Sequence, residues 1–372
     1  MNRDVRPRAV APPTDEAAVF HAAHEGYRPT PIRRLPAVAA ELGLGAVALK
    51  DESERFGLPA FKVLGASWAA ELALREHPQA RAVVAASAGN HGRAVAHVAA
   101  RRGLHCRIFV PARAAAARRD AIAGEGAEVI VVEGSYEDAV AQAASAGARR
   151  DVIELADVGS SAPASWVIDG YATLFGELPD QGAFDVILVP VGVGSLAAAA
   201  ARFGAKVGAK VIGIEPVTAA CLMASLAAGR PTPVPTPGTS MAGLDCAEVS
   251  DAAWPSLRDG VHGVLTVSDS EVHAAMRELA AAGFAIGDSG AAPLAALRAL
   301  TDEPHCAALR EAVALDAQAR VLLIATEGPT DPAAYRRAVS LRSALLNREP
   351  DSERDQDAAG HSVERALDAR SP

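Results

Sequence analysis

The sequence predicts an α/β fold with two open, mostly parallel sheets flanked by helices. Short apolar runs alternate along the chain with alanine-rich stretches of helical periodicity, a pattern typical of parallel sheets covered by helices. Nine such runs are present, which is many for one open sheet. The chain has 372 residues, of which 50% are hydrophobic. It is therefore long enough for two lobes, each with its own core.

Each strand is expected where aliphatic and β-branched residues run together between turn signals, and most are followed by a helix. In chain order the expected strands are Ala46–Lys50, Ala82–Ala86, Cys106–Val110, Glu128–Val132, Val152–Leu155, Val186–Val189, Val211–Glu215, Gly263–Val267 and Val321–Ala325.

Polar, proline-rich and charged stretches mark both ends of the chain. We expect a partly flexible N-terminal arm over residues 1–30 and a disordered tail over 347–372. Between them we expect a large lobe made of 31–80 and 180–346, and a small lobe made of 81–179.

Charge and composition exclude several classes of protein. The formal net charge is -9 and the basic residues are scattered, so we expect no nucleic-acid partner. No apolar run approaches the roughly 18 residues of a membrane span, and the first residues lack a signal-peptide core, so we expect a cytoplasmic protein without a membrane partner. No two of the four cysteines have CxxC spacing, and no metal site is expected. Cys221 and Cys246 flank a proline-rich loop and could meet, but free thiols are expected in a reducing compartment.

Lysine is rare in this chain. It occurs only at Lys50, Lys62, Lys206 and Lys210, so 32 of the 36 basic residues (36 minus 4) are arginine. Arginine cannot supply a titratable, nucleophilic amine.

Lys62 lies among apolar residues at the expected start of a helix. Such a setting predicts a lowered pKa and an amine that can act as nucleophile or base. The alternative is a surface lysine whose stem lies along apolar residues.

Two turns between a strand and a helix are candidates for anion binding. Ser87, Gly89, Asn90 and His91 bring backbone N–H groups and small polar side chains to one point, which suits a carboxylate. The segment Gly192–Ser195 is a glycine-rich turn before an alanine-rich helix, which suits a phosphate. It matches neither the Walker loop nor the dinucleotide fingerprint, which argues against a nicotinamide dehydrogenase. Ordinary turn roles are the alternative for both segments.

Thr326 follows the last expected strand and begins a polar segment at the same sheet edge. The alternative is that this segment caps the following helix. A reactive lysine, a phosphate turn and a carboxylate turn, all at strand ends, match the requirements of pyridoxal 5'-phosphate.

The chain resembles the fold type II pyridoxal-phosphate enzymes, the group of threonine dehydratase, cysteine synthase and the tryptophan synthase β subunit, over roughly Phe20 to Ala344. The GNHG motif by itself indicates only fold type II. The further motifs RFGLxAFK and MAGLxC make the chain similar to the branch of diaminopropionate ammonia-lyases. Other matching segments are VPVGVGSLAAA, SWVIDGYATLFGEL and TEGPTD.

This resemblance implies that Lys62 binds the cofactor as a Schiff base and takes the α-proton, and that Asp157 is a second catalytic candidate. The implied contacts are Asn90 to the ring hydroxyl, Gly192, Val193, Gly194 and Ser195 to the phosphate, Thr326 to the ring nitrogen, Ser87, Ala88, Gly89 and His91 along the substrate carboxylate, and Asp157 to a distal ammonium. A turn or helix-capping role is the alternative for Asp157.

The implied reaction is α,β-elimination of ammonia from 2,3-diaminopropionate by a homodimeric lyase, giving pyruvate and ammonia. Two positions depart from the family. Pro59 removes a backbone amide from the loop before Lys62. Ala88 replaces an acidic residue that the family uses to take the α-proton of the D-enantiomer, which predicts a preference for the L-enantiomer. The alternatives are β-elimination or β-replacement on another β-substituted alanine, or a binding module without activity.

Overall fold

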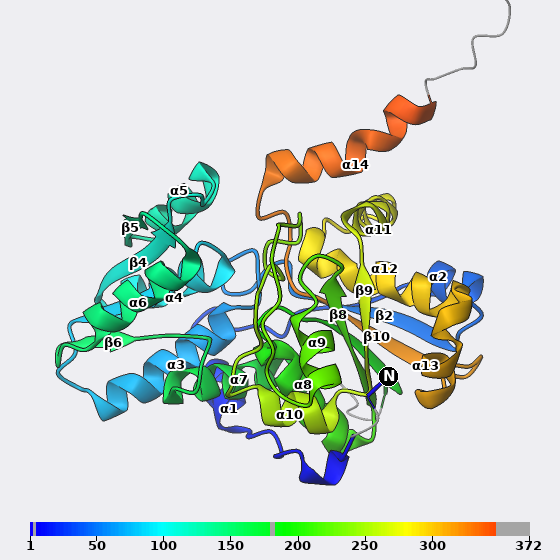
Figure 1. Cartoon of the computed structure of the whole chain (residues 1–372), viewed down its shortest axis with the longest axis horizontal. Helices are drawn as coiled ribbons and strands as arrows, with labels where there is room; N and C mark the ends of the chain where they lie inside the picture. Colours follow the sequence, from blue (N-terminus) through cyan, green and yellow to red (C-terminus); the bar gives the residue numbers. More distant parts are fainter. Residues whose placement is uncertain (3–4, 179–182, 347–372) are drawn as a thin grey trace, which may run out of the picture. The chain divides into compact units, whose positions relative to one another are not determined.

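Ten strands form two separate sheets in the described part of the chain. The computed structural model describes residues 1–2, 5–178 and 183–346, with side chains to residue 340. Both sheets lie in one unit, residues 1–339 (Figure 1). The tail predicted over 347–372 lies outside the described residues.

The larger sheet has the strand order β1-β2-β10-β7-β8-β9 and the smaller sheet the order β5-β4-β3-β6. All pairs are parallel except β1 with β2, which is antiparallel. The larger sheet contains β1 (Ile32–Arg34), β2 (Ala46–Asp51), β7 (Val186–Pro190), β8 (Lys210–Pro216), β9 (Gly263–Val267) and β10 (Arg320–Ala325). The smaller sheet contains β3 (Ala82–Ala86), β4 (His105–Pro111), β5 (Glu128–Val132) and β6 (Val152–Glu154).

The predicted fold class and all nine predicted strands are confirmed, with ends that differ by one residue at most. Strand β1 was not predicted. It has the sequence Ile-Arg-Arg, and both arginines are exposed. Three residues with one partly buried apolar side chain are too few to produce an alternating pattern.

The described helices surround both sheets. They are α1 (Glu16–Ala22), α2 (Pro36–Glu41), α3 (Val63–Glu76), α4 (Asn90–Arg101), α5 (Ala116–Gly124), α6 (Tyr136–Gly147), α7 (Ala162–Gly176), α8 (Ser195–Val207), α9 (Cys221–Ala228), α10 (Trp254–Gly260), α11 (Asp269–Ala281), α12 (Asp288–Asp302), α13 (Ala307–Ala312) and α14 (Pro332–Leu346), with 3₁₀ turns η1 (Pro7–Ala9) and η2 (Pro304–Cys306). None of these described helices is long and apolar enough to cross a membrane.

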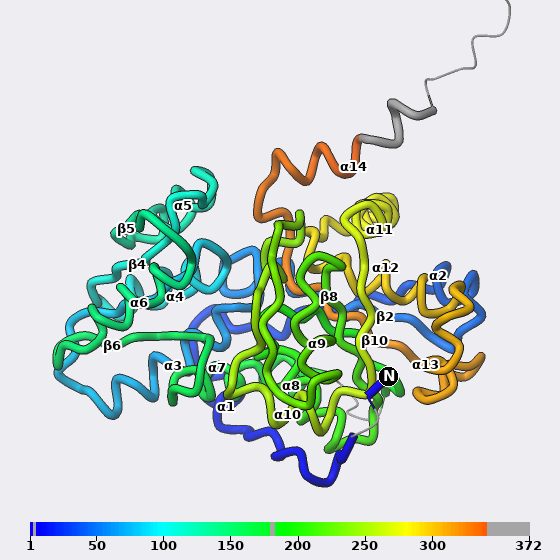
Figure 2. The backbone as a smooth tube through the Cα atoms, in the orientation of Figure 1, coloured from blue at the N-terminus to red at the C-terminus, as the bar shows by residue number. Residues whose placement is uncertain are grey.

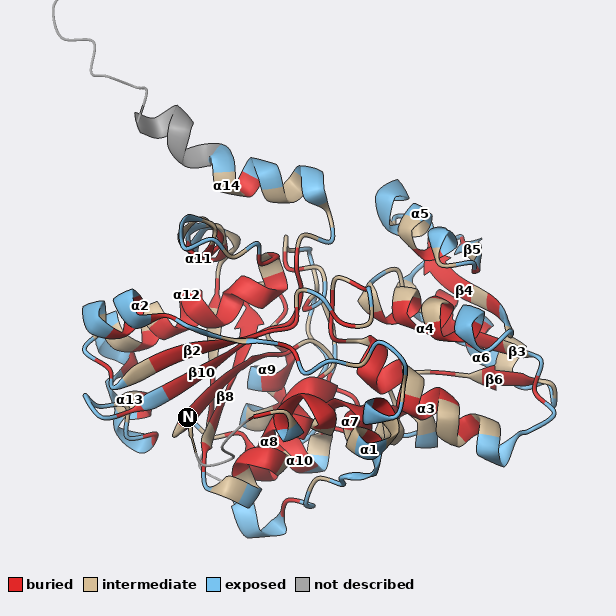
Figure 3. Ribbon diagram, turned by 180° about the vertical axis from the view of Figure 1, so that it is seen from behind, coloured by how far each residue is buried: buried red, intermediate tan, exposed pale blue. Residues whose placement is uncertain are grey.

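Both faces of the larger sheet are buried, as Figure 3 shows by colour. Strand β7 shows why the central strands of this sheet have uninterrupted apolar sequences. Ile187 and Val189 point into the core formed with α3, α7, α8 and α10, whereas Val186 and Leu188 point into the core formed with α2, α11, α12 and α13. Because successive side chains of a strand face opposite ways, a strand covered on both faces needs apolar residues at every position.

The smaller sheet is covered in the same way. Val84 and Phe109 pack with α6 on one face, and Val83 and Ile108 pack with α4 and α5 on the other. All four strands of this sheet fall within the segment 81–179 predicted as the small lobe. Helix α7, near the end of that segment, packs against α3 and α8, so the lobe boundary itself stays a prediction.

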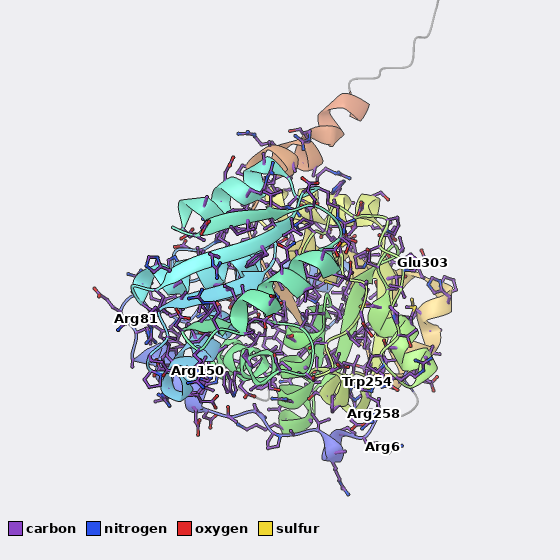
Figure 4. The ribbon with its side chains drawn as sticks, turned by 60° about the vertical axis from the view of Figure 1, so that its left-hand side comes forward. Arg6, Arg81, Arg150, Trp254, Arg258 and Glu303 are labelled. Carbon is purple, nitrogen blue, oxygen red and sulfur yellow. The ribbon has the colours of Figure 1, made fainter. Side chains whose placement is uncertain are left out.

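The amino-terminal ends of the strands lie away from the candidate site. The backbone N–H of Arg81, just before β3, donates to Asp151 O just before β6, and Figure 4 labels Arg81 and Arg150 at this edge. The N-terminal arm runs along α10, as the tube in Figure 2 shows. Its Arg6 N–H donates to Asp259 O.

Candidate active site

Lys62 lies at the end of the loop that connects β2 to α3. It is the N-cap residue of α3, and its side chain is 19% exposed. Its Nζ lies 3.0 Å from Oδ2 of Asp157. The rings of Phe61 and Tyr171 have their centroids 5.6 and 5.8 Å from the same nitrogen. The amine therefore lies between aromatic faces and one carboxylate.

The lowered pKa predicted for Lys62 is wrong for this structure. Burial does act to lower the pKa of the amine, but Tyr171 and the carboxylate of Asp157 favour the charged form more strongly and raise it. The prediction considered only the apolar neighbours in sequence. Asp157 is 95 residues away along the chain and could not be placed beside Lys62 from local sequence.

Asp157 follows β6 and is buried. Burial acts to raise its pKa, but His91 and Lys62 outweigh burial and lower the pKa to about 2. His91 Nδ1 lies 3.6 Å from Oδ2 of Asp157, while its Nε2 donates to Leu155 O at 2.8 Å. Burial lowers the pKa of His91. Asp157 is thus an ionised carboxylate that faces the amine of Lys62.

The turn from Ser87 to His91 connects β3 to α4. Gly89 is the N-cap residue of α4 and its N–H donates to Ser87 Oγ. A Cβ on Gly92 would lie 2.2 Å from Ser87 O, so only glycine allows this close approach of the helix to the turn. Ala88, between Ser87 and Gly89, brings no ionisable group to the turn.

The predicted phosphate turn connects β7 to α8. Gly194 caps α8 in the left-handed conformation, with φ +92°. A Cβ on Gly192 would lie 2.5 Å from Gly243 O. The hydroxyl of Ser195 donates to Asp157 O at 3.3 Å. Val193 O accepts from Ser250 N. The turn is therefore held on both sides, with the free N–H groups of a 13-residue helix at its end.

Thr326 directly follows β10. It is buried, and its Oγ1 has no hydrogen-bond partner among the described residues. A buried hydroxyl without a partner is costly unless a bound group satisfies it. Phe61, the neighbour of Lys62, donates its N–H to Thr326 O, so the hydroxyl lies on the segment that packs against the lysine loop.

The other lysines do not share this position. Lys50 is completely buried, and its Nζ donates to Thr30 O and to Glu177 Oε2 at 2.8 and 2.6 Å. Its charge is thus held in a closed ion pair. Lys206 is exposed in the last turn of α8, and Lys210 begins β8 at the amino-terminal edge of the sheet.

Cys221 and Cys246 are both free. Both sulfur atoms lie near Gly192, so the two cysteines approach one another as the sequence suggested. Cys221 Sγ lies 3.5 Å from Gly192 O, and a Cβ on Gly192 would meet Cys246 Sγ at 3.1 Å.

Further residues in the described part of the chain reach the site without having been predicted. Glu327 bonds to Asn90, Tyr171 lies beside Lys62, and the hydroxyl of Tyr136 donates to Ala86 O just before the Ser87 turn. The position of Glu327 next to Thr326, at a strand end, was a usable signal. Tyr171 lies in the segment SWVIDGYATLFGEL, which matches the family but gave Tyr171 no role, and Tyr136 lies on a helix without a comparable sequence signal.

Comparison with known proteins agrees with this geometry. Residues 23–327 match the family model described as pyridoxal-phosphate dependent enzyme. The chain is 32% identical to diaminopropionate ammonia-lyase of Salmonella typhimurium, over 86% of this chain and 90% of that protein. It is also 32% identical to the biosynthetic L-threonine dehydratase of the same organism, over 79% of this chain but only 57% of that protein.

Solved structures show the same relation. Diaminopropionate ammonia-lyase from Escherichia coli, in complex with an aminoacrylate–pyridoxal phosphate azomethine reaction intermediate, superposes with a TM-score of 0.83 at 31% identity, over 91% of this chain and 95% of that chain. Maize serine racemase superposes with a TM-score of 0.75 at 25% identity, over 92% and 98%.

The residues present fit this cofactor. The unpartnered hydroxyl of Thr326 can meet a ring nitrogen, the turn ending in Gly194 can hold a dianion, and Lys62 offers an amine that can form a Schiff base. The chain therefore belongs to the pyridoxal-phosphate-dependent enzymes, with the fold of type II and with similarity to diaminopropionate ammonia-lyase along most of its length.

Proposed function

We propose that this enzyme eliminates ammonia from 2,3-diaminopropionate, giving pyruvate and ammonia, and that it favours the L-enantiomer. The observation that carries the proposal is the contact between Lys62 Nζ and Asp157 Oδ2. It places a candidate base beside a carboxylate suited to a second ammonium group. The coverage of relatives named for this activity supports the same substrate.

Asp157 has a double role in this proposal. In the described structure its carboxylate holds the Lys62 amine in the charged form. A substrate with a β-ammonium group competes with Lys62 for that carboxylate. When the substrate takes it, the pKa of Lys62 falls because its nearest counter-charge is shared. Binding of the diamine thus prepares Lys62 to accept a proton.

The chain's other residues bind and orient. Bound pyridoxal phosphate supplies the electron sink for loss of the α-proton. Lys62 accepts that proton. The Cβ–N bond then breaks, and the β-nitrogen leaves with its electron pair as ammonia, because ammonia departing from the β-ammonium held at Asp157 is a better leaving group than an amide ion. Water then hydrolyses the released enamine to pyruvate, which frees the α-nitrogen as a second ammonia. Ser87, Gly89 and His91 orient the substrate carboxylate at the N-terminus of α4.

Enantiomer preference follows from Ala88. A lysine on one face of the bound cofactor would not reach a proton on the opposite face. The turn from Ser87 to Gly89 offers no carboxylate in its place. We therefore expect the D-enantiomer to react more slowly by about 10² to 10⁴, the contribution of a positioned general base.

The test is a substrate panel with purified holoenzyme. Pyruvate and ammonia are measured with L- and D-2,3-diaminopropionate, L-serine, L-threonine and an O-acylated serine. We expect the highest kcat/KM with L-2,3-diaminopropionate, and Ala88→Asp should raise the value for the D-enantiomer. Equal rates for both enantiomers in the unmodified enzyme would contradict the role given to Ala88.

A second candidate is β-elimination or β-replacement on another β-substituted alanine, such as serine or threonine. The similarity to L-threonine dehydratase favours it. Turnover of L-serine or L-threonine in the same panel, without turnover of the diamine, would select this candidate. We also propose that the enzyme is a cytoplasmic homodimer. Light scattering of the purified protein tests the oligomeric state.

A further inference from the structure

Glu327 is a buried carboxyl at the candidate site that the proposed reaction does not use. Its residue is 6% exposed. Its Oε2 accepts a hydrogen bond from Asn90 Nδ2 at 2.5 Å, and its Oε1 accepts one from Ser289 N at 3.3 Å. No described lysine or arginine forms an ion pair with it. A carboxyl buried without a cation is expensive to keep, which calls for a reason other than stability.

The backbone that carries Glu327 is held firmly. Gly287 N donates to Glu327 O at 2.9 Å, and an isolated β-bridge pairs Glu327 with Ala60, two residues before Lys62. A Cβ on Gly290 would lie 2.9 Å from Glu327 O, so α12 also packs directly on this backbone. Glu327 is thus a rigid part of the larger-sheet side of the site.

Asn90 belongs to the other side. It is the first residue of α4, which packs on the smaller sheet, and 237 residues separate it from Glu327. The single hydrogen bond from Asn90 Nδ2 to Glu327 Oε2 therefore joins the turn after β3 to the end of β10. Resemblance to the family assigns the Asn90 amide to the ring hydroxyl of the cofactor, so its orientation matters for the bound group.

We propose that the Glu327 carboxyl holds the Asn90 amide in place for bound pyridoxal phosphate, so that Glu327 is a positioning residue that joins the two lobes at the cofactor. The carboxyl oxygen accepts one amide N–H of Asn90, which leaves the amide oxygen and the second N–H to face the cofactor. Burial raises the pKa of Glu327, and the bonds from Ser289 and Asn90 oppose that rise. This inference depends on the cofactor and not on the identity of the substrate.

The test measures the cofactor and not turnover. Glu327→Ala, Asn90→Ala, the double variant and Glu327→Gln are prepared as apoproteins and titrated with pyridoxal phosphate. Affinity is measured together with the induced circular dichroism of the cofactor's absorption band, which reports its orientation. Far-ultraviolet circular dichroism shows that each variant is folded.

Glu215→Gln is the matched control. Glu215 is fully buried and also accepts from two backbone N–H groups, those of Leu222 and Met223. Among the described residues, no hydrogen bond or ion pair joins Glu215 to Asn90, Lys62 or Thr326. This variant should leave the affinity and the dichroism of the cofactor unchanged.

Glu327→Ala should weaken cofactor affinity about tenfold, as expected for loss of a hydrogen bond to a carboxyl group, and should reduce the induced dichroism. Asn90→Ala should have the same effects, and the double variant should be no worse than either one, because the two residues act as one unit. Glu327→Gln keeps an acceptor oxygen for Asn90 and should restore both signals.

Three results would overturn the proposal. One is unchanged dichroism and affinity in a folded Glu327→Ala variant. Another is a double variant whose losses multiply, which would mean that the residues act independently. The third is a Glu327→Gln variant as impaired as Glu327→Ala. None of these readouts changes if the preferred substrate proves to be other than the diamine, so the two proposals fail separately.

Discussion

Replacing Gly194 by alanine is the sharpest perturbation of the predicted phosphate turn. Gly194 has φ +92°, in the left-handed region, and its added Cβ would lie 2.6 Å from Cδ1 of Leu257. Leu257 is completely buried on α10, so its side chain cannot turn away into solvent. The turn must shift instead, and it carries the N–H groups proposed to hold the phosphate.

The free-energy cost of Gly194→Ala has two parts. An alanine in the left-handed region costs about 1–2 kcal/mol. The contact with Leu257 adds about 1–3 kcal/mol, the range for overpacking a buried site. Gly208 separates these parts. It caps the other end of α8 at φ +83°, but a Cβ there meets no atom within 4 Å. Gly208→Ala should therefore show the conformational cost alone and leave cofactor binding unchanged.

The stability of both variants is measured by urea unfolding of the apoproteins. In a separate experiment, the folded apoproteins are titrated with pyridoxal phosphate to measure cofactor affinity. We expect Gly194→Ala to lose at least a factor of ten in cofactor affinity, about 1.4 kcal/mol, and Gly208→Ala to bind as the parent does. If Gly194→Ala keeps the parent's affinity while its stability falls, the phosphate is held elsewhere and the assignment of this turn is wrong.

Three more predictions follow from the site and its surroundings. Borohydride reduction of the holoenzyme and peptide mapping should find the cofactor on Lys62; label on Lys206 or Lys210 instead would refute its role. Asp157→Asn removes a charge that raises the pKa of Lys62, so covalent capture of the cofactor should proceed at lower pH than in the parent, and an unchanged pH profile would argue against this coupling. Burial raises the pKa of Glu215 from 4.5 to about 7. Folding stability should therefore fall by about 3 kcal/mol as pH rises from 4.5 to 7, because the folded state binds the proton more tightly. Glu215→Gln should flatten that part of the curve in urea unfolding.

Local sequence was sufficient for the strands and the turns between strand and helix. A strand covered on both faces must be apolar at every position, so β7 and β10 are recognisable from a few residues. Gly192 and Gly194 mark their turn because no side chain is tolerated there. Lys62 was recognisable because lysine is scarce and its neighbours are apolar. The carbonyl of the proline at position 59, where the chain departs from the family, accepts a hydrogen bond from Gly328 N.

The electrostatics of the site were decided by the tertiary structure alone. The pKa of Lys62 is raised and not lowered because β6 ends opposite the β2–α3 loop and brings Asp157 within 3.0 Å. Lys50 is another of the four lysines, but its amine donates a hydrogen bond to the carboxylate of Glu177. Glu327 meets Asn90 only because the ends of β10 and β3 converge. Composition and periodicity describe which residues a segment buries. They do not predict which charged residue from a distant part of the sequence will lie beside a buried group, because that depends on how the two sheets pack against each other.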